Sequence, residues 1–302
     1  MEHSHTHDPA LQQFNGAFAI AVILNLSFTI IEAIYAIAAN SMSLLGDAAH
    51  NLGDVLGLLL AWGANWLLTK PSTLRYSYGY KKTTIIASLI NALLLVGTGF
   101  IIGYEAILKL INPEPTQEIT VILIATIGIL INGGTALLFL RGSKEDLNIK
   151  GAFLHLAVDA LISLGVVITG VIILLTRIEW LDPIMGLLIV VTIFYGTWEL
   201  LHNSILLLLD AVPASVDYYA VENYLKSIEG VDSIHDLHIW GLSTKETALT
   251  AHLIMPNQQQ LSDEKYHQIN QVLKTQFKIH HVTLQIEQGQ QDALCHRTAG
   301  CH

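Results

Sequence analysis

The chain has 302 residues, of which 52% are hydrophobic and only 13% are charged, and its formal net charge at pH 7 is −10. Soluble proteins carry about 25% charged residues, so the composition excludes an ordinary soluble protein, and the acidic balance argues against a nucleic-acid partner. The apolar residues form runs that reach the roughly 20 residues needed to span a bilayer as a helix. The composition therefore predicts an α-helical polytopic membrane protein.

Six hydrophobic segments follow one another along the chain. They cover about residues 14–38, 42–68, 84–108, 117–140, 150–176 and 183–208. The second and fourth connections hold most of the basic residues: Lys70, Arg75, Lys81, Lys82, Arg141, Lys144 and Lys150. Because basic connections stay in the cytoplasm, and because six spans return the chain to its starting side, both termini are predicted to be cytoplasmic. The expected location is the inner (plasma) membrane, with the chain crossing it several times.

After about residue 210 the composition becomes that of a soluble domain. The expected elements are a helix at 215–229, strands at 231–239 and 246–255, a helix at 263–277 and a strand at 281–287. The order αββαβ predicts a small α+β, ferredoxin-like cytoplasmic domain with helices on one face of a sheet. The predicted domains are a His-containing N-terminal segment (1–13), a six-helix transmembrane domain (14–210), a cytoplasmic domain (211–288) and a Cys/His tail (289–302).

Two copies of His-x-x-x-Asp lie inside the second and fifth hydrophobic segments. They are His50 with Asp54, and His155 with Asp159. Residues four apart on a helix share a face, so each copy directs one imidazole and one carboxylate toward a common point. Two such helices side by side would supply four ligands, a set that suits tetrahedral Zn²⁺.

The two motifs are predicted to lie at the same depth. Asp54 comes 12 residues after Met42 on a segment running inward, and Asp159 comes 10 residues after Ile149 on a segment running outward. At 1.5 Å per residue these depths are roughly 18 Å and 15 Å from opposite surfaces. Both carboxylates then fall near the midplane of a hydrocarbon core about 30 Å thick.

The alternative is that these polar residues only hold helices together. A carboxylate at the membrane centre costs roughly 2.5–3.5 kcal/mol on insertion scales, whereas a helix–helix hydrogen bond in a bilayer contributes only about 0.6 kcal/mol. A metal site explains these carboxylates better, because a divalent cation, or protons when the cation is absent, would neutralise the charge that makes them costly in the membrane.

Other polar residues inside the segments have open roles. Glu32 either lines an outer mouth of the pathway or extends to the membrane interface. Asp47, one turn before His50, is predicted to accept a hydrogen bond beside the site, with a direct ligand role as the alternative. Four further residues are interpreted as interhelical hydrogen-bond partners: Asn25, Asn91, Asn132 and Ser163.

The sequence resembles the cation diffusion facilitator family, close to its bacterial zinc-efflux members. The resemblance covers nearly the whole chain and rests on five stretches: residues 41–50 (SMSLLGDAAH), 75–80 (RYSYGY), 147–148 (LN), 182–184 (DPI) and 235–240 (HDLHIW). It implies a dimeric, proton-coupled exporter whose metal site comes from the second and fifth helices. In this chain that site would be His50, Asp54, His155 and Asp159, and a His at position 50 goes with zinc over cadmium.

The resemblance also implies a regulatory zinc site in the cytoplasmic domain. It would be formed by His235, His252 and His280 with Glu287 nearby, and the choice between His280 and His281 stays open. Strand alternation is expected to separate His235 from His238. At the chain ends, Cys295-His296, Cys301-His302 and the histidines at positions 3, 5 and 7 are either extra chelators or adventitious binders.

The predicted function is proton-coupled efflux of Zn²⁺ from the cytoplasm by a homodimer in the lipid bilayer. Zinc is expected as the transported substrate and as a regulatory ligand, with no other cofactor. An intramembrane metalloenzyme would need an open coordination position and a general base, as in His-Glu-x-x-His. That motif is absent from this sequence, so no enzymatic activity is expected; a metal sensor without transport is the remaining alternative.

Overall fold

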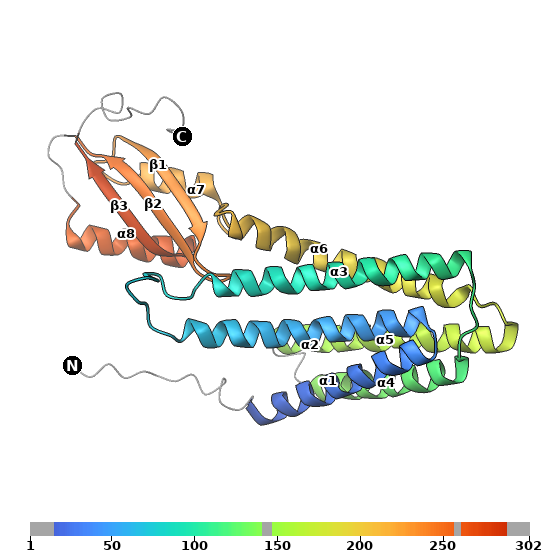
Figure 1. Ribbon diagram of the computed structural model, residues 1–302. Coiled ribbons are helices and arrows are strands. Elements are labelled where there is room, and N and C mark those ends of the chain that lie inside the picture. The colour runs from blue at the N-terminus through green and yellow to red at the C-terminus, as the bar shows by residue number, and fades with distance from the viewer. Residues whose placement is uncertain (1–14, 141–146, 257–260, 289–302) are drawn as a thin grey trace. The chain divides into compact units, whose positions relative to one another are not determined.

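The computed structural model describes residues 15–140, 147–256 and 261–288 (Figure 1). The predicted chelators at the two chain ends lie outside these residues. Six long helices come first: α1 (Asn15–Ala38), α2 (Met42–Leu68), α3 (Thr83–Ile111), α4 (Glu118–Phe139), α5 (Leu147–Thr176) and α6 (Leu181–Leu208). The shorter elements follow: α7 (Tyr218–Lys226), β1 (Ser233–Gly241), β2 (Thr247–Ile254), α8 (Asp263–Gln276) and β3 (Ile279–Glu287).

The six long helices match the six hydrophobic segments to within three residues at each end. Among the described residues, α3 to α6 contain four stretches long and apolar enough to cross a membrane: Thr83–Ile111, Glu118–Leu137, Phe153–Thr176 and Leu181–Leu208. The helical transmembrane domain is therefore confirmed, while the crossing of the membrane by α1 and α2 stays a prediction. Helix α2 is also long, with 27 residues, but it carries Asp47, His50 and Asp54 and is less apolar than these four stretches.

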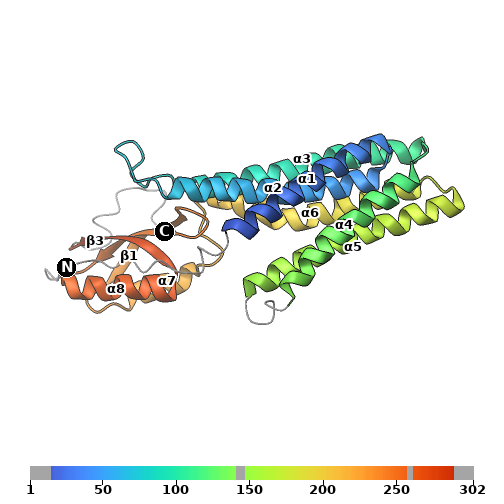
Figure 2. The ribbon, with the colours of Figure 1, turned by 90° about the horizontal axis from the view of Figure 1, so that it is seen from below.

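The structure divides into two compact units. The first contains Met1–Leu59 and Asn91–Trp198. Within it, α4 and α5 pack against each other as an antiparallel pair (Figure 2). The core of this unit includes Phe28, Leu44 and Ile189. Large apolar side chains such as Ile37 and Leu130 face outward, as expected of helices surrounded by lipid.

The beginning of α2 is held by a carboxylate from the beginning of α6. The Asp182 carboxylate accepts hydrogen bonds from the Ser41 hydroxyl (2.6 Å), the Ser43 hydroxyl (2.6 Å) and the Met42 backbone N–H (2.5 Å). Free backbone N–H groups and the positive end of the helix dipole favour an anion at this position. The contact fixes where α2 begins, and therefore which turns carry His50 and Asp54.

The second unit contains Leu60–Ile90 and Glu199–His302. Its three strands lie in the order β1-β2-β3, with β1 antiparallel and β3 parallel to β2. Helices α7 and α8 cover one face of this sheet (Figure 2). Leu225 of α7, Leu249 of β2 and Leu273 of α8 are fully buried in the shared core. The predicted αββαβ order is confirmed.

One feature of β1 differs from the predicted alternation. The register shifts between His235 and His238, and Asp236 has a φ of 49°. His235 lies opposite His252, and His238 lies opposite Thr250, two residues earlier on β2. Since residues two apart on a strand share a face, His235 and His238 lie on the same face. The extra residue of a β-bulge resets the alternation, which a count along the sequence alone does not show.

Candidate metal sites

The structure brings the two His-x-x-x-Asp motifs of α2 and α5 together. His50 Nε2 lies 3.3 Å from an Asp159 oxygen, and His155 Nε2 lies 3.2 Å from an Asp54 oxygen, so each imidazole meets the carboxylate of the other helix. Within each helix the corresponding distances are 3.8 Å for His50–Asp54 and 3.7 Å for His155–Asp159. These four residues are called the membrane tetrad below.

The spacing of the membrane tetrad matches the ligand spacing of a zinc site. Bonds of about 2.0–2.2 Å in a tetrahedron place neighbouring ligand atoms about 3.3–3.6 Å apart. The four His–Asp distances fall between 3.2 and 3.8 Å. Two neutral imidazoles and two carboxylates would also cancel the charge of Zn²⁺. Three of the four residues, His50, Asp54 and Asp159, each place one ligand atom within 4.8 Å of the others.

Burial in the membrane tetrad is uneven. Asp159 is 3% exposed, whereas the His155 side chain is 49% exposed. The Nδ1 atom of His50 is buried without a hydrogen-bond partner in the described part of the chain. A half-exposed imidazole next to a buried carboxylate gives an ion a point of entry and a place to bind.

Two further acidic residues of the first unit, Asp47 and Glu32, are bonded to groups outside the membrane tetrad. Asp47 is fully buried and accepts a hydrogen bond from the Ser163 hydroxyl at 2.6 Å. Glu32 is also fully buried and accepts one from the Asn51 side-chain amide at 3.1 Å. Glu32 therefore neither extends to the membrane interface nor lines an open mouth. Ser163 links α5 to α2, in agreement with its interpretation as an interhelical partner.

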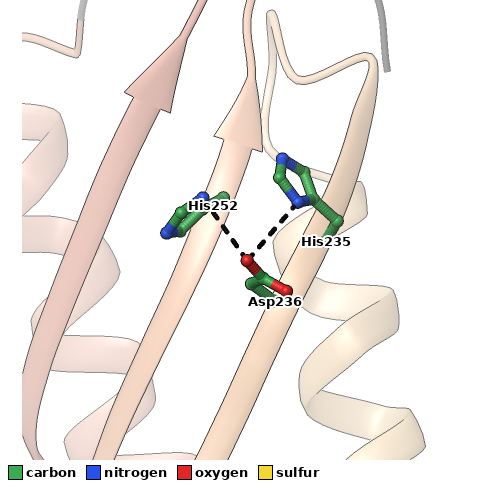
Figure 3. A group of neighbouring side chains, drawn as sticks. All are labelled: His235, Asp236 and His252. Carbon is green, nitrogen blue, oxygen red and sulfur yellow. Dashed lines mark ion pairs between the residues drawn. The ribbon is translucent and has the colours of Figure 1, made fainter. Parts of the chain in front are cut away.

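A second group of possible ligands lies in the sheet of the second unit, where β1, β2 and β3 run side by side. The Glu287 carboxylate lies 3.1 Å from His235 Nε2 and 2.8 Å from His252 Nδ1. The Asp236 carboxylate lies between the two imidazoles, 3.9 Å from His235 Nδ1 and 4.0 Å from His252 Nδ1 (Figure 3). These four residues are called the sheet cluster below.

The sheet cluster is partly shielded from solvent. The His235 side chain is 6% exposed and that of Glu287 is 13% exposed, whereas those of His252 and Asp236 are 27% and 39% exposed. The Nδ1 atom of His235 has no hydrogen-bond partner in the described part of the chain. The cluster thus combines imidazole and carboxylate ligands that suit zinc with access from one side.

The structure does not bring His280 to the sheet cluster. His280 lies seven residues before Glu287 on β3, which is about 23 Å along an extended strand at roughly 3.3 Å per residue. Its Nδ1 faces the Thr247 backbone N–H at 3.5 Å. His281 contacts the Tyr78 ring, with ring centroids 5.4 Å apart. Both histidines lie at the opposite end of β3 from Glu287.

Sequence reasoning did not include Asp236 among the candidate ligands. Regular alternation directs a residue next to His235 to the other face of the strand, away from that histidine. The bulge at Asp236, with its positive φ, returns the carboxylate to the neighbouring imidazoles. In the sequence, the sign that Asp236 could contribute to this site was its position directly after His235.

Comparison with known proteins supports one family. The cation efflux transmembrane domain matches residues 18–209, and the cytoplasmic domain of cation efflux proteins matches residues 213–289. The metal cation efflux system protein CzcD of Cupriavidus metallidurans is 34% identical over 300 residues, covering 98% of this chain and 94% of that protein.

Two further relatives are similar over most of their length. The zinc transporter ZitB of Escherichia coli is 31% identical over 293 residues, covering 95% of this chain and 93% of that protein. The cadmium, cobalt and zinc/H(+)-K(+) antiporter of Bacillus subtilis is 31% identical over 275 residues, covering 89% of this chain and 87% of that protein. Because the two domain models together match residues 18–209 and 213–289 and the three relatives match over most of their length, the chain belongs to the cation diffusion facilitator (cation efflux) family, in its bacterial zinc-efflux type.

Proposed function

We propose that this protein exports Zn²⁺ from the cytoplasm in exchange for protons, and that the membrane tetrad is the transport site. The observation that carries the proposal is the geometry of His50, Asp54, His155 and Asp159, whose His–Asp distances of 3.2–3.8 Å approach a tetrahedral ligand shell. The names of ZitB and of the Bacillus subtilis antiporter support zinc as cargo and protons as the exchanged ion.

Proton exchange follows from the chemistry of these ligands. Zinc binds neutral imidazole and ionised carboxylate, so protons on the four side chains must leave before the metal can bind. Each imidazole lies within 4 Å of two carboxylates, so protons can be held in the same space that zinc occupies. Protons and zinc therefore compete for one site, and inward proton movement drives outward zinc movement.

The sheet cluster is proposed as the cytoplasmic zinc sensor of the same protein. It offers two imidazoles and two carboxylates, from Asp236 and Glu287, at the point where the three strands run side by side. His280 is left out of this set because it lies at the other end of β3. The match to the cytoplasmic domain of cation efflux proteins supports a homodimer.

The proposed placement is the inner membrane, with both termini and the cytoplasmic domain on the cytoplasmic side. The matches to cation efflux proteins support a multi-pass membrane protein, and the basic connections support this orientation. An enzymatic role is not proposed, because four protein ligands leave zinc no coordination position at which a substrate or water can be activated.

The test is zinc flux into proteoliposomes that contain only this protein and have a controlled pH gradient. The wild type should accumulate zinc when protons can move in the opposite direction, and Asp159→Asn should lower the initial rate by at least about 10–100-fold. Glu118→Gln is the matched control, since Glu118 pairs with Arg177 at 2.8 Å, away from the tetrad. Gradient-independent flux in the wild type, or full flux in Asp159→Asn, would contradict the proposal.

A further inference from the structure

Two buried carboxyl groups beside the membrane tetrad have no role in metal ligation. Glu32 of α1 and Asp47 of α2 are both fully buried. Asn51, one turn after Asp47 on α2, donates a hydrogen bond to the Glu32 carboxyl, which places that carboxyl on the face of α2 that carries Asp47. The two carboxyl groups interact there electrostatically. They are called the carboxyl pair below.

Each member of the carboxyl pair has one satisfied oxygen and one unsatisfied oxygen. Asn51 donates to Glu32 Oε2 at 3.1 Å, and Ser163 donates to Asp47 Oδ2 at 2.6 Å. Glu32 Oε1 and Asp47 Oδ1 have no donor in the described part of the chain. Ionised carboxylates only accept hydrogen bonds, so these two buried oxygens need a proton or another cation nearby.

A proton fits this place best. Two adjacent negative charges in a membrane interior would carry the cost of two buried ions plus their mutual repulsion. One shared proton removes one charge and supplies the missing hydrogen bond, as in other buried carboxyl dyads. A metal ion would require additional ligands, whereas the remaining oxygens of the pair already accept hydrogen bonds from Asn51 and Ser163.

The carboxyl pair is placed to influence the metal. Asn51 follows His50 directly, and Ser163 lies one turn after Asp159 on α5. Asp47 also interacts electrostatically with His50 and Asp159, the charged groups that face it from α2 and α5, and with Glu32 from α1. A change in the charge of the pair therefore changes the potential at the membrane tetrad and the hydrogen bonds that hold α2 against α5.

We propose that Glu32 and Asp47 form a proton-binding site, separate from the metal ligands, that carries a coupling proton. The proposal deepens the proton exchange proposed above and rests on it. With one proton the pair has a charge of −1 and favours zinc in the tetrad. A second proton, taken up from the outside, neutralises the pair and weakens zinc binding; that proton then leaves to the cytoplasm. By linkage, zinc and this proton must weaken each other's binding equally.

The test compares the double carboxamide variant, Glu32→Gln with Asp47→Asn, with the wild type in proteoliposomes containing separate zinc and pH indicators. Both carboxyls must be replaced, because one remaining carboxyl could still take up and release the coupling proton. The double carboxamide variant keeps all four metal ligands, so zinc binding should persist. The number of protons moved per zinc should fall by one, and the slope of log Kd for zinc against pH should fall by about one. Glu118→Gln, which removes a carboxylate elsewhere, should keep both wild-type values.

Three results separate the outcomes. Wild-type coupling and pH slope in the double carboxamide variant would overturn this inference alone, whereas a wild type without proton movement would overturn the proposed exchange itself. The double exchange Glu32→Asp with Asp47→Glu keeps two carboxyls and should keep coupling. If the double carboxamide variant does not fold, the infrared carbonyl band of a protonated carboxyl in the wild type at neutral pH decides: its presence supports the inference and its absence overturns it.

Discussion

At the scale of single residues, the ligand type at position 50 is predicted to decide which metal fits the membrane tetrad. His50 contributes one nitrogen in a fixed direction, set by its place on α2 and by Asp159 at 3.3 Å. A compact set of two imidazoles and two carboxylates suits Zn²⁺. A larger ion such as Cd²⁺ gains from extra oxygen ligands, which the wild-type tetrad cannot readily supply.

His50→Asp should therefore raise the ratio of cadmium to zinc transport, on the order of tenfold, which corresponds to about 1.4 kcal/mol. The new carboxylate can bind through two oxygens and removes one fixed imidazole direction. The measurement is the initial flux of each metal in proteoliposomes at one pH gradient. An unchanged ratio would show that selectivity is set elsewhere along the pathway.

The sheet cluster allows a residue-scale prediction with an internal control. Glu287→Gln removes the carboxylate that lies within 3.1 Å of both His235 and His252, so the full-length protein should bind less zinc per chain, and about 10–100-fold more weakly at this site. His280→Ala, at the other end of the same strand, should leave zinc binding unchanged. Equilibrium dialysis on both variants measures this, and equal losses would argue against the cluster.

At the scale of elements, the start of α2 depends on a carboxylate from another helix. The Asp182 carboxylate accepts hydrogen bonds from two hydroxyls and one backbone N–H, all within 2.6 Å, and Asp182 is only 1% exposed. Gly186, one turn further along α6, lies so close to α2 that an added Cβ would come within 2.9 Å of the Met42 backbone. Hydrogen bonds to the Asp182 carboxylate and close packing at Gly186 thus both hold the beginnings of α2 and α6 together.

Asp182→Ala should lower the free energy of unfolding by about 2–4 kcal/mol, because it leaves several buried donors without an acceptor. Ser43→Ala removes a single hydrogen bond to the same carboxylate and should cost only about 1 kcal/mol. Thermal unfolding of both variants in detergent gives the comparison. Equal effects would mean that Asp182 is not the centre of this contact.

At the scale of the whole molecule, charge sets the proposed orientation in the membrane. The second connection carries Lys81 and Lys82, which form ion pairs with Glu246 (2.5 Å) and Asp210 (2.7 Å) of the same compact unit. That unit also contains the sheet cluster. A connection paired to the soluble domain must lie on the same side of the membrane as that domain.

Single cysteines introduced at Ser72 and at Glu114 should report opposite sides. In a background where Cys295 and Cys301 are replaced by serine, Ser72→Cys should react with a membrane-impermeant maleimide only in inverted vesicles. Glu114→Cys should react in intact cells, because its connection is predicted to face outward. Both positions are exposed, so labelling of both from one side would contradict the predicted crossings.

The sequence alone determined those features that depend on local periodicity. The long helices follow from runs of apolar residues, and the four members of the membrane tetrad follow from two pairs of residues one helical turn apart, because a helix places such pairs on one face whatever packs against it. The αββαβ order is also a local feature, because alternating apolar residues indicate the strands and turn residues indicate where they end.

Only the tertiary structure decided which residues from different elements meet. The bulge at Asp236 and the parallel pairing of β3 with β2 place Glu287 beside His252 and leave His280 at the far end, and register between strands is not encoded in either strand by itself. The meeting of Glu32 with Asp47 likewise depends on how α1 packs against α2. A buried acid in one helix does not reveal its partner in another, since that contact depends on the packing of both helices.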